Sequence, residues 1–237
     1  ACLLGIDLGS LAQRSMNGRA ESISRRFVNG YEPSLDSLFR WLRDIYVEGE
    51  PMPWLVSPAP AGHDVSILFT HDVDFGPSVR NSPAFARALE ARGARGTFFV
   101  QTKYMKDYND SIFFDEFALP VLAGLRAKGH ELGSHTVAHS GRFEFMALGD
   151  GKERYPSYRP RVTSVATVDD ATILGELRVS KYLLETLVDA EVSSFRPGRL
   201  SYPFSLPQAM VASDYRYSSS ITANIVLTHL PFQLTDG

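Results

Sequence analysis

From Val65 onward, the sequence alternates short apolar runs of strand length with segments of helical periodicity. The predicted strands cover residues 65–70, 96–101, 130–134, 192–196, 215–221 and 224–228. The predicted helices cover residues 82–92, 117–128, 168–190 and 206–212. Strands that alternate with helices pair in parallel, so this order restricts the chain to an α/β sheet or a barrel.

The N-terminal quarter of the chain has a different character. Residues 31–47 carry apolar side chains at helical spacing, and the stretch 48–62 that follows contains four prolines. We therefore expect an N-terminal helical and extended appendage with a proline-rich linker over residues 1–62. The α/β domain is expected to occupy residues 63–237.

Composition and charge exclude several kinds of partner. The formal net charge is −3 and the apolar fraction is 44%, which is typical of a globular protein. A chain with this charge has no electrostatic case for binding nucleic acid or an anionic membrane surface. No apolar run approaches the roughly 20 residues that a membrane-spanning helix needs. We expect neither nucleic acid as a partner nor a transmembrane segment.

Residues with metal-binding chemistry follow two of the predicted strands. Asp72 and Asp74 are separated by one residue, so their side chains point the same way on an extended backbone. His135 and His139 are four residues apart, which on a helix would place both imidazoles on one face. The carboxyl ends of parallel strands meet at one edge, where these groups would gather. Carboxylate and imidazole ligands are typical of a hydrolytic metal centre with an open position for water.

Arg196 ends another predicted strand and is expected at the same edge. A guanidinium beside Asp72 would hold that carboxylate ionised and oriented. Pro197 and Gly198 come next in the sequence. They would bring the backbone close to a substrate and offer an N–H group to a developing oxyanion.

The segment 141–167 interrupts the alternation of strands and helices. It is long for a connection and rich in Tyr, Arg and Pro. Because it directly follows the histidines, one interpretation is that it lines a substrate groove, with tyrosines packed on sugar rings. The other interpretation is an ordinary surface insertion, and the sequence leaves both open.

Four stretches occur in the order of the motifs of the polysaccharide deacetylases, the NodB-homology domain of carbohydrate esterase family 4. They are residues 70–74, 135–139, 195–198 and 217–220. The chain from about Val65 to its end resembles this family. The resemblance implies an α/β fold of the distorted (β/α) barrel type, with residues 63–237 as the catalytic domain. It also leads us to expect that the domain is incomplete at its C-terminus.

The same resemblance implies a metal-dependent hydrolase that acts on carbon–nitrogen bonds other than peptide bonds. Its substrate would be an N-acetylated polysaccharide or oligosaccharide, from which it removes N-acetyl groups. The implied ion is Zn²⁺, with Co²⁺ or Ni²⁺ as alternatives. The implied location is the cell envelope or the extracellular space, with the cytoplasm as the alternative. Two other functions stay open: hydrolysis of a small non-peptide amide on the same fold, and a catalytically inactive carbohydrate-binding relative.

Residue roles follow from the resemblance position by position. Asp72 resembles the general base, Asp74 the metal carboxylate, and Arg196 the arginine that orients the base. The two imidazole ligands would be His135 and His139. The expected substrate-binding residues are Pro197, Gly198, Tyr217, Ser218 and Ser219.

The sequence departs from the family pattern at three points. Val73 separates two aspartates that are adjacent in the family, so the roles of Asp72 and Asp74 could be exchanged. Ser218 stands where the fourth motif usually has Asp. His229, within Leu-Thr-His, resembles the catalytic acid, but it follows the fourth motif closely. The alternative is an acid beyond Gly237.

Overall fold

The computed structural model describes residues 5, 7, 18–20, 27–29, 34–55, 59–63, 65–106, 112–160 and 170–221. These residues fall into two compact units that divide between Ser66 and Ile67. The domain limits of 1–62 and 63–237 stay a prediction. The expected strand at 224–228 and the candidate acid His229 lie outside the described residues.

The smaller unit contains a strand pair and one helix. Strands β1 (Gly18–Ala20) and β2 (Phe27–Asn29) pair antiparallel, and helix α2 spans Ser34–Gly49. The hydroxyl of Tyr46 accepts a hydrogen bond of 3.0 Å from the backbone N–H of Trp54. This contact joins the proline-rich stretch to the helix that precedes it.

The larger unit is built on a parallel sheet of five strands. They are β3 (Thr70–Val73), β4 (Thr97–Val100), β5 (Glu131–Ser134), β6 (Ser194–Phe195) and β7 (Tyr217–Ser218). Their order in the sheet is their order in the sequence, and each pairs in parallel with the next. The α/β class and the parallel sheet predicted from the sequence are confirmed.

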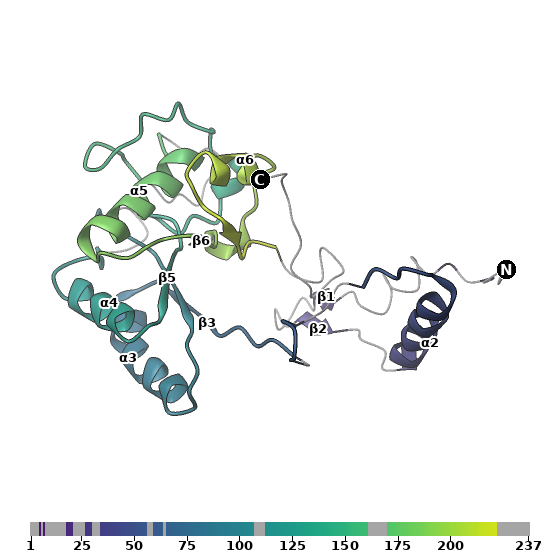
Figure 1. The fold of residues 1–237 in the computed structure, drawn as a ribbon. Coiled ribbons are helices and arrows are strands. Elements are labelled where there is room, and N and C mark those ends of the chain that lie inside the picture. The colour runs from purple at the N-terminus through teal and green to yellow at the C-terminus, as the bar shows by residue number, and fades with distance from the viewer. Residues whose placement is uncertain are drawn as a thin grey trace. The chain divides into compact units, whose positions relative to one another are not determined.

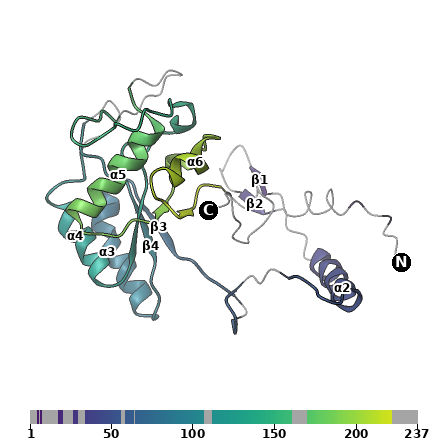
Figure 2. The same ribbon diagram turned by 45° about the horizontal axis from the view of Figure 1, so that its top comes forward.

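Helices connect the strands of this sheet. The α-helices are α3 (Gly76–Glu90), α4 (Ala118–Ala127), α5 (Ile173–Leu187) and α6 (Leu206–Val211). The short 3₁₀ helices are η1 (Phe143–Phe145) and η2 (Gly198–Leu200). Figures 1 and 2 show α3, α4 and α5 on the same side of the strands. A sheet wound in sequential order with its helices on one face is the arrangement of a (β/α) barrel, whereas a doubly wound sheet has helices on both faces.

The register of the sheet aligns the carboxyl ends of the strands. One row of pairing joins the last residues of the five strands: Val73, Val100, Ser134, Phe195 and Ser218. The next residue along each strand therefore leaves the sheet at the same level. These residues are Asp74, Gln101, His135, Arg196 and Ser219. Four of the five are candidate site residues, so the register accounts for their convergence.

Helix α5 supplies much of the core behind this edge. The Oγ1 atom of Thr172 caps its first turn by accepting the N–H of Gly175 at 3.0 Å. Its buried face follows the helical period and consists largely of apolar residues, including Ile173, Leu177, Leu183 and Leu184.

Replacing Leu184 with Ala is expected to lower the free energy of unfolding by about 2–5 kcal/mol. The side chain is fully buried, so truncation removes apolar contacts and leaves a cavity in the core. Urea unfolding followed by circular dichroism measures the change. An unfolding free energy equal to that of the wild type would contradict the assignment of Leu184 to the core.

The first strand lies further along the chain than the sequence predicts. The apolar run 65–70 was expected to be the strand, but β3 spans Thr70–Val73. Ladder bonding begins only where the carbonyl of Phe69 accepts the N–H of Thr97, at 2.9 Å. The side chains of Val65 and Leu68 are exposed, so they do not contribute to the core. Asp72 consequently lies within the strand rather than after it.

Among the described residues, no helix is both long enough and apolar enough to cross a bilayer.

Candidate metal centre

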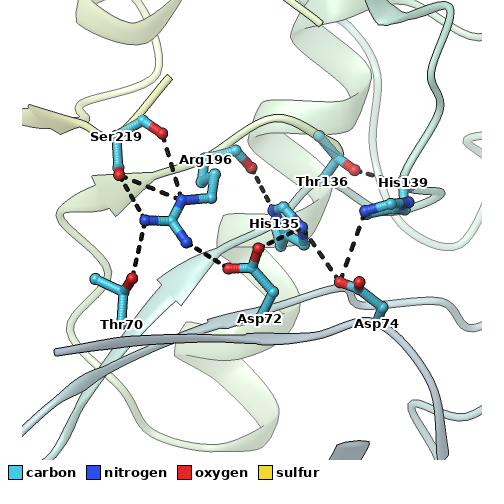
Figure 3. A network of polar contacts seen from close by, with 8 residues as sticks. All are labelled: Thr70, Asp72, Asp74, His135, Thr136, His139, Arg196 and Ser219. Atoms are coloured by element: carbon cyan, nitrogen blue, oxygen red, sulfur yellow. Dashed lines mark hydrogen bonds and ion pairs between the residues drawn. The ribbon is translucent and has the colours of Figure 1, made fainter. Parts of the chain in front are cut away.

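Three side chains that can bind a metal converge at the carboxyl edge of the sheet. One ligand atom from each of Asp74, His135 and His139 lies within 4.8 Å of the others. The Oδ1 atom of Asp74 is 3.2 Å from Nε2 of His135 and 3.6 Å from Nε2 of His139 (Figure 3). Ligand atoms about 2.1 Å from a tetrahedral ion lie about 3.4 Å apart. The two separations measured from Asp74 Oδ1 are close to this value and suit a single ion.

A hydrogen bond at the far side of the His135 ring indicates its tautomer. Its Nδ1 atom lies 2.7 Å from the carbonyl oxygen of Arg196. A carbonyl can only accept, so Nδ1 carries a proton, and in the neutral ring Nε2 then presents a lone pair. Nε2 thus faces the Asp74 carboxylate as a second acceptor. Among the described residues, neither His135 Nε2 nor Asp74 Oδ1 has a hydrogen-bond partner, although both are buried. Two buried acceptors that face each other fit a bound cation.

The charges of the other two side chains also suit a metal ligand. Burial acts to raise the pKa of Asp74, but the contact with His135 and the positive charge that His139 carries when it is protonated lower it more, so the pKa lies below its usual value. Burial, and next the neighbouring His135, lower the pKa of His139. An ionised carboxylate and a neutral imidazole are the forms that bind metal ions.

A turn, rather than a helix, brings the two histidines together. The expectation drawn from helical spacing was therefore wrong: β5 ends at Ser134, and residues 135–140 form no helix. Thr136 and His139 have φ values of 67° and 50°, in the left-handed region. The Oγ1 atom of Thr136 accepts the N–H of His139 at 2.9 Å and closes the turn. The two rings meet edge to face, with centroids 4.8 Å apart.

Arg196 holds Asp72 beside this cluster. Its Nη1 atom donates to Asp72 Oδ1 at 2.6 Å, and Nη2 donates to Thr70 Oγ1 at 3.1 Å (Figure 3). The guanidinium lies 4.3 Å above the centre of the Phe99 ring. The second oxygen of Asp72, Oδ2, is 3.8 Å from His135 Nε2. Asp72 is thus oriented on one side and faces the proposed metal ligands on the other.

Ser219 contacts the opposite side of the same guanidinium. Its Oγ atom accepts from Arg196 Nη2 at 2.7 Å and from Nε at 3.2 Å. The Tyr217 side chain is 65% exposed, and the Ser218 hydroxyl donates to Ser220 at 2.7 Å. Of the three candidates from the fourth motif, Ser219 is the one whose side chain contacts Arg196 in the described structure.

Gly198 lies against the backbone of His139. A Cβ atom at position 198 would come within 2.7–2.9 Å of three His139 backbone atoms, which is too close for any side chain. Pro197 precedes it and leads into η2. This segment was expected near the substrate, and in the structure its glycine lies directly against the backbone of a proposed metal ligand.

Two further histidines have other partners. The His71 ring stacks on Phe85 with centroids 4.9 Å apart. His130 accepts the N–H of Gly96 at 3.2 Å, and its Nε2 atom is 3.2 Å from a Glu90 carboxylate oxygen. Both contacts lie outside the Asp74–His135–His139 cluster.

Three residues that support the site were not predicted from the sequence. Thr70 and Thr136 bond to Arg196 and to the His139 backbone, and both lie within the motifs. The third is Glu176, a fully buried carboxylate on α5. Glu176 could have been found from the sequence, because it is an acidic residue next to Leu177 on the apolar face of the predicted helix.

Comparisons with known proteins identify the family of this chain. The family model described as polysaccharide deacetylase matches residues 61–218. No curated protein sequence gives a significant match.

Three solved structures are similar to parts of this chain. A deacetylase from Streptococcus pyogenes in complex with acetate is 12% identical, with a TM-score of 0.45 over 74% of this chain and 60% of that one. The deacetylase domain of BpsB from Bordetella bronchiseptica is 16% identical, with a TM-score of 0.43 over 78% and 75%. A mutant CE4 family pseudoenzyme with restored enzymatic activity is 15% identical, with a TM-score of 0.44 over 64% and 43%. This chain thus spans less than two thirds of the first and third of these proteins.

Proposed function

The chain belongs to the polysaccharide deacetylase family, and on that premise we propose that it is a metal-dependent hydrolase that removes N-acetyl groups from an amino-sugar polysaccharide. The observation that carries the proposal is the cluster of Asp74, His135 and His139 with Asp72 directly beside it. These side chains combine a ligand set with an adjacent carboxylate that can act as a base.

The proposed chemistry divides between an ion and the side chains of this chain. A divalent ion held by Asp74, His135 and His139, with Zn²⁺ as first choice, would supply polarisation of the acetyl carbonyl and a lowered pKa for the attacking water. Asp72 would accept the proton of that water. Its Oδ1 atom is engaged by Arg196, which leaves Oδ2 on the side of His135. His229 is proposed as the acid that protonates the leaving amine.

The contacts favour one assignment of the two aspartates. Asp74 approaches both imidazoles, at 3.2 and 3.6 Å, which is the relation expected of a shared metal ligand. Asp72 approaches Arg196 at 2.6 Å, which suits an oriented base. The Asp72 side chain is 38% exposed, so water can reach it. We therefore propose Asp74 as ligand and Asp72 as base.

The test is release of acetate by the full-length protein. Apo protein is reconstituted with Zn²⁺, Co²⁺ or Ni²⁺ and incubated with chitooligosaccharides or peptidoglycan, and free acetate is measured. Acetate should appear only with metal present and disappear on chelation. Metal-loaded protein that binds these glycans without releasing acetate would instead support the inactive carbohydrate-binding relative. Turnover of small amides alone would support the small-amide alternative.

Replacing Ser219 with Ala is expected to lower kcat about tenfold, because Arg196 loses a hydrogen-bond acceptor that contacts two of its nitrogens. The ion should still bind, since Ser219 contacts none of the three proposed ligands in the described structure. Initial rates of acetate release and metal content by mass spectrometry measure both quantities. An unchanged kcat would contradict a role for Ser219 in positioning Arg196.

A further inference from the structure

Glu176 on α5 bonds to the turn that joins the two histidines. Its Oε2 atom accepts the backbone N–H groups of Val137 and Ala138, each at 2.8 Å. Its side chain is fully buried. We propose that Glu176 is a positioning residue that sets the separation of the His135 and His139 imidazoles and thereby the affinity for the metal. The inference rests on the proposed metal-dependent function.

The turn needs such an acceptor for two reasons. Val137 and Ala138 are buried, so without Glu176 no water could accept hydrogen bonds from their N–H groups. An unpaired buried N–H group lowers the stability of the fold. Thr136 has a φ of 67°, which a β-branched residue rarely adopts without support from its surroundings. A carboxylate that accepts two adjacent N–H groups forms strong bonds and fixes the direction of the peptides between the two histidines.

A tyrosine from the long insertion holds Glu176 in turn. The hydroxyl of Tyr158 donates to Oε1 of Glu176 at 2.9 Å. Burial and the charge of Glu176 raise the pKa of Tyr158, so the hydroxyl stays protonated and remains a donor. Gly175 makes room for the ring, because a Cβ atom at that position would overlap it. Tyr158, in segment 141–167, thus supports the turn between the two histidines through Glu176. Neither interpretation of that segment predicted this role.

The experiment compares metal affinity among folded variants. Glu176→Ala removes both acceptor contacts, and Glu176→Gln retains an oxygen that can accept the same two N–H groups. Leu184→Ala is the matched control, since it truncates another fully buried side chain of α5. Zn²⁺ affinity is measured by competition with a chromophoric chelator, and ligand geometry by the visible absorption of the Co²⁺ form. Near-UV circular dichroism verifies folding.

Glu176→Ala is expected to weaken Zn²⁺ binding by about 10- to 100-fold and to alter the Co²⁺ spectrum. Glu176→Gln keeps the acceptor for both N–H groups and loses the one for Tyr158, so its loss should not exceed that of Tyr158→Phe. Leu184→Ala should keep wild-type affinity despite its lower stability. If Glu176→Ala does not fold, Tyr158→Phe carries the test, with an expected loss of about tenfold.

The outcomes separate this inference from the proposed function. Folded Glu176→Ala with wild-type affinity and spectrum would overturn the role of Glu176, and so would a control that weakens binding equally. In the Tyr158→Phe version, unchanged affinity would overturn it. Wild-type protein that binds no metal would overturn the metal-dependent function itself.

Discussion

Exchanging Asp72 for Asn is expected to slow acetate release by about 10²- to 10⁴-fold while the metal remains bound. The amide cannot accept the proton of the attacking water, and loss of a general base typically costs this factor. Asn has nearly the same shape as Asp and can still accept a hydrogen bond from Arg196 through its carbonyl oxygen. The measurement is kcat for acetate release, together with the metal content of the same preparation.

Asp74→Asn is the matched control because it makes the same chemical change two residues away. It should weaken metal binding, since the carboxylate oxygen that approaches both imidazoles becomes part of a neutral amide. The pair of variants also decides between the two assignments of the aspartates. If Asp72→Asn lost the metal and Asp74→Asn kept it, ligand and base would be exchanged.

Much of the larger unit could be predicted because its pattern is local. Strands β4 and β5 and helix α4 lie within one or two residues of the predicted limits. Their apolar runs are buried, and Gly129 ends the second helical segment with a φ of 81°. In these segments the apolar residues of the sequence are also the buried residues of the structure, which is why their limits could be predicted.

The limits of β3 and α3 differ from the prediction by up to six residues, because an exposed apolar run misled the first and prolines misled the second. The exposed run before Thr70 resembles a strand, yet the residues that pair with β4 are the four that follow it, Thr70–Val73. Helix α3 begins at Gly76, six residues before the predicted start, with a proline in its first turn and Pro83 inside it. A proline is compatible with the first helical turn, because the N–H it lacks has no partner there.

The residues at the site were easier to predict than the contacts that hold them. Asp74, His135 and Arg196 could be expected at one edge because each follows a strand of a parallel sheet, and the register brings them to one level. The turn after His135 could not be predicted, because its residues in the left-handed region are a threonine and a histidine rather than glycines. Glu176 acts from a helix far along the chain, and such long-range bonds leave no local pattern.

Removing the His135 imidazole is expected to have the largest effect on metal binding. Loss of a residue that hydrogen-bonds to a metal ligand typically lowers affinity by roughly 10- to 100-fold. His135→Ala removes a ligand itself, so it should lower Zn²⁺ affinity by more than that. The ring is almost fully buried and is fixed by the Arg196 carbonyl, so no other side chain can readily replace it. Acetate release should fall with the metal content. Metal per chain after dialysis, and the rate at saturating Zn²⁺, measure the two effects.

His130→Ala separates loss of a ligand from loss of a buried histidine. Its ring is also buried and sits just before the same strand, but it bonds to the Gly96 N–H and to Glu90. The control should lose stability and keep both the ion and the activity. If His135→Ala retained wild-type metal content, or if His130→Ala lost the metal to the same extent, the Asp74–His135–His139 cluster would not be the metal site. The acceptors at 3.2 Å would then need another cation or a proton between them.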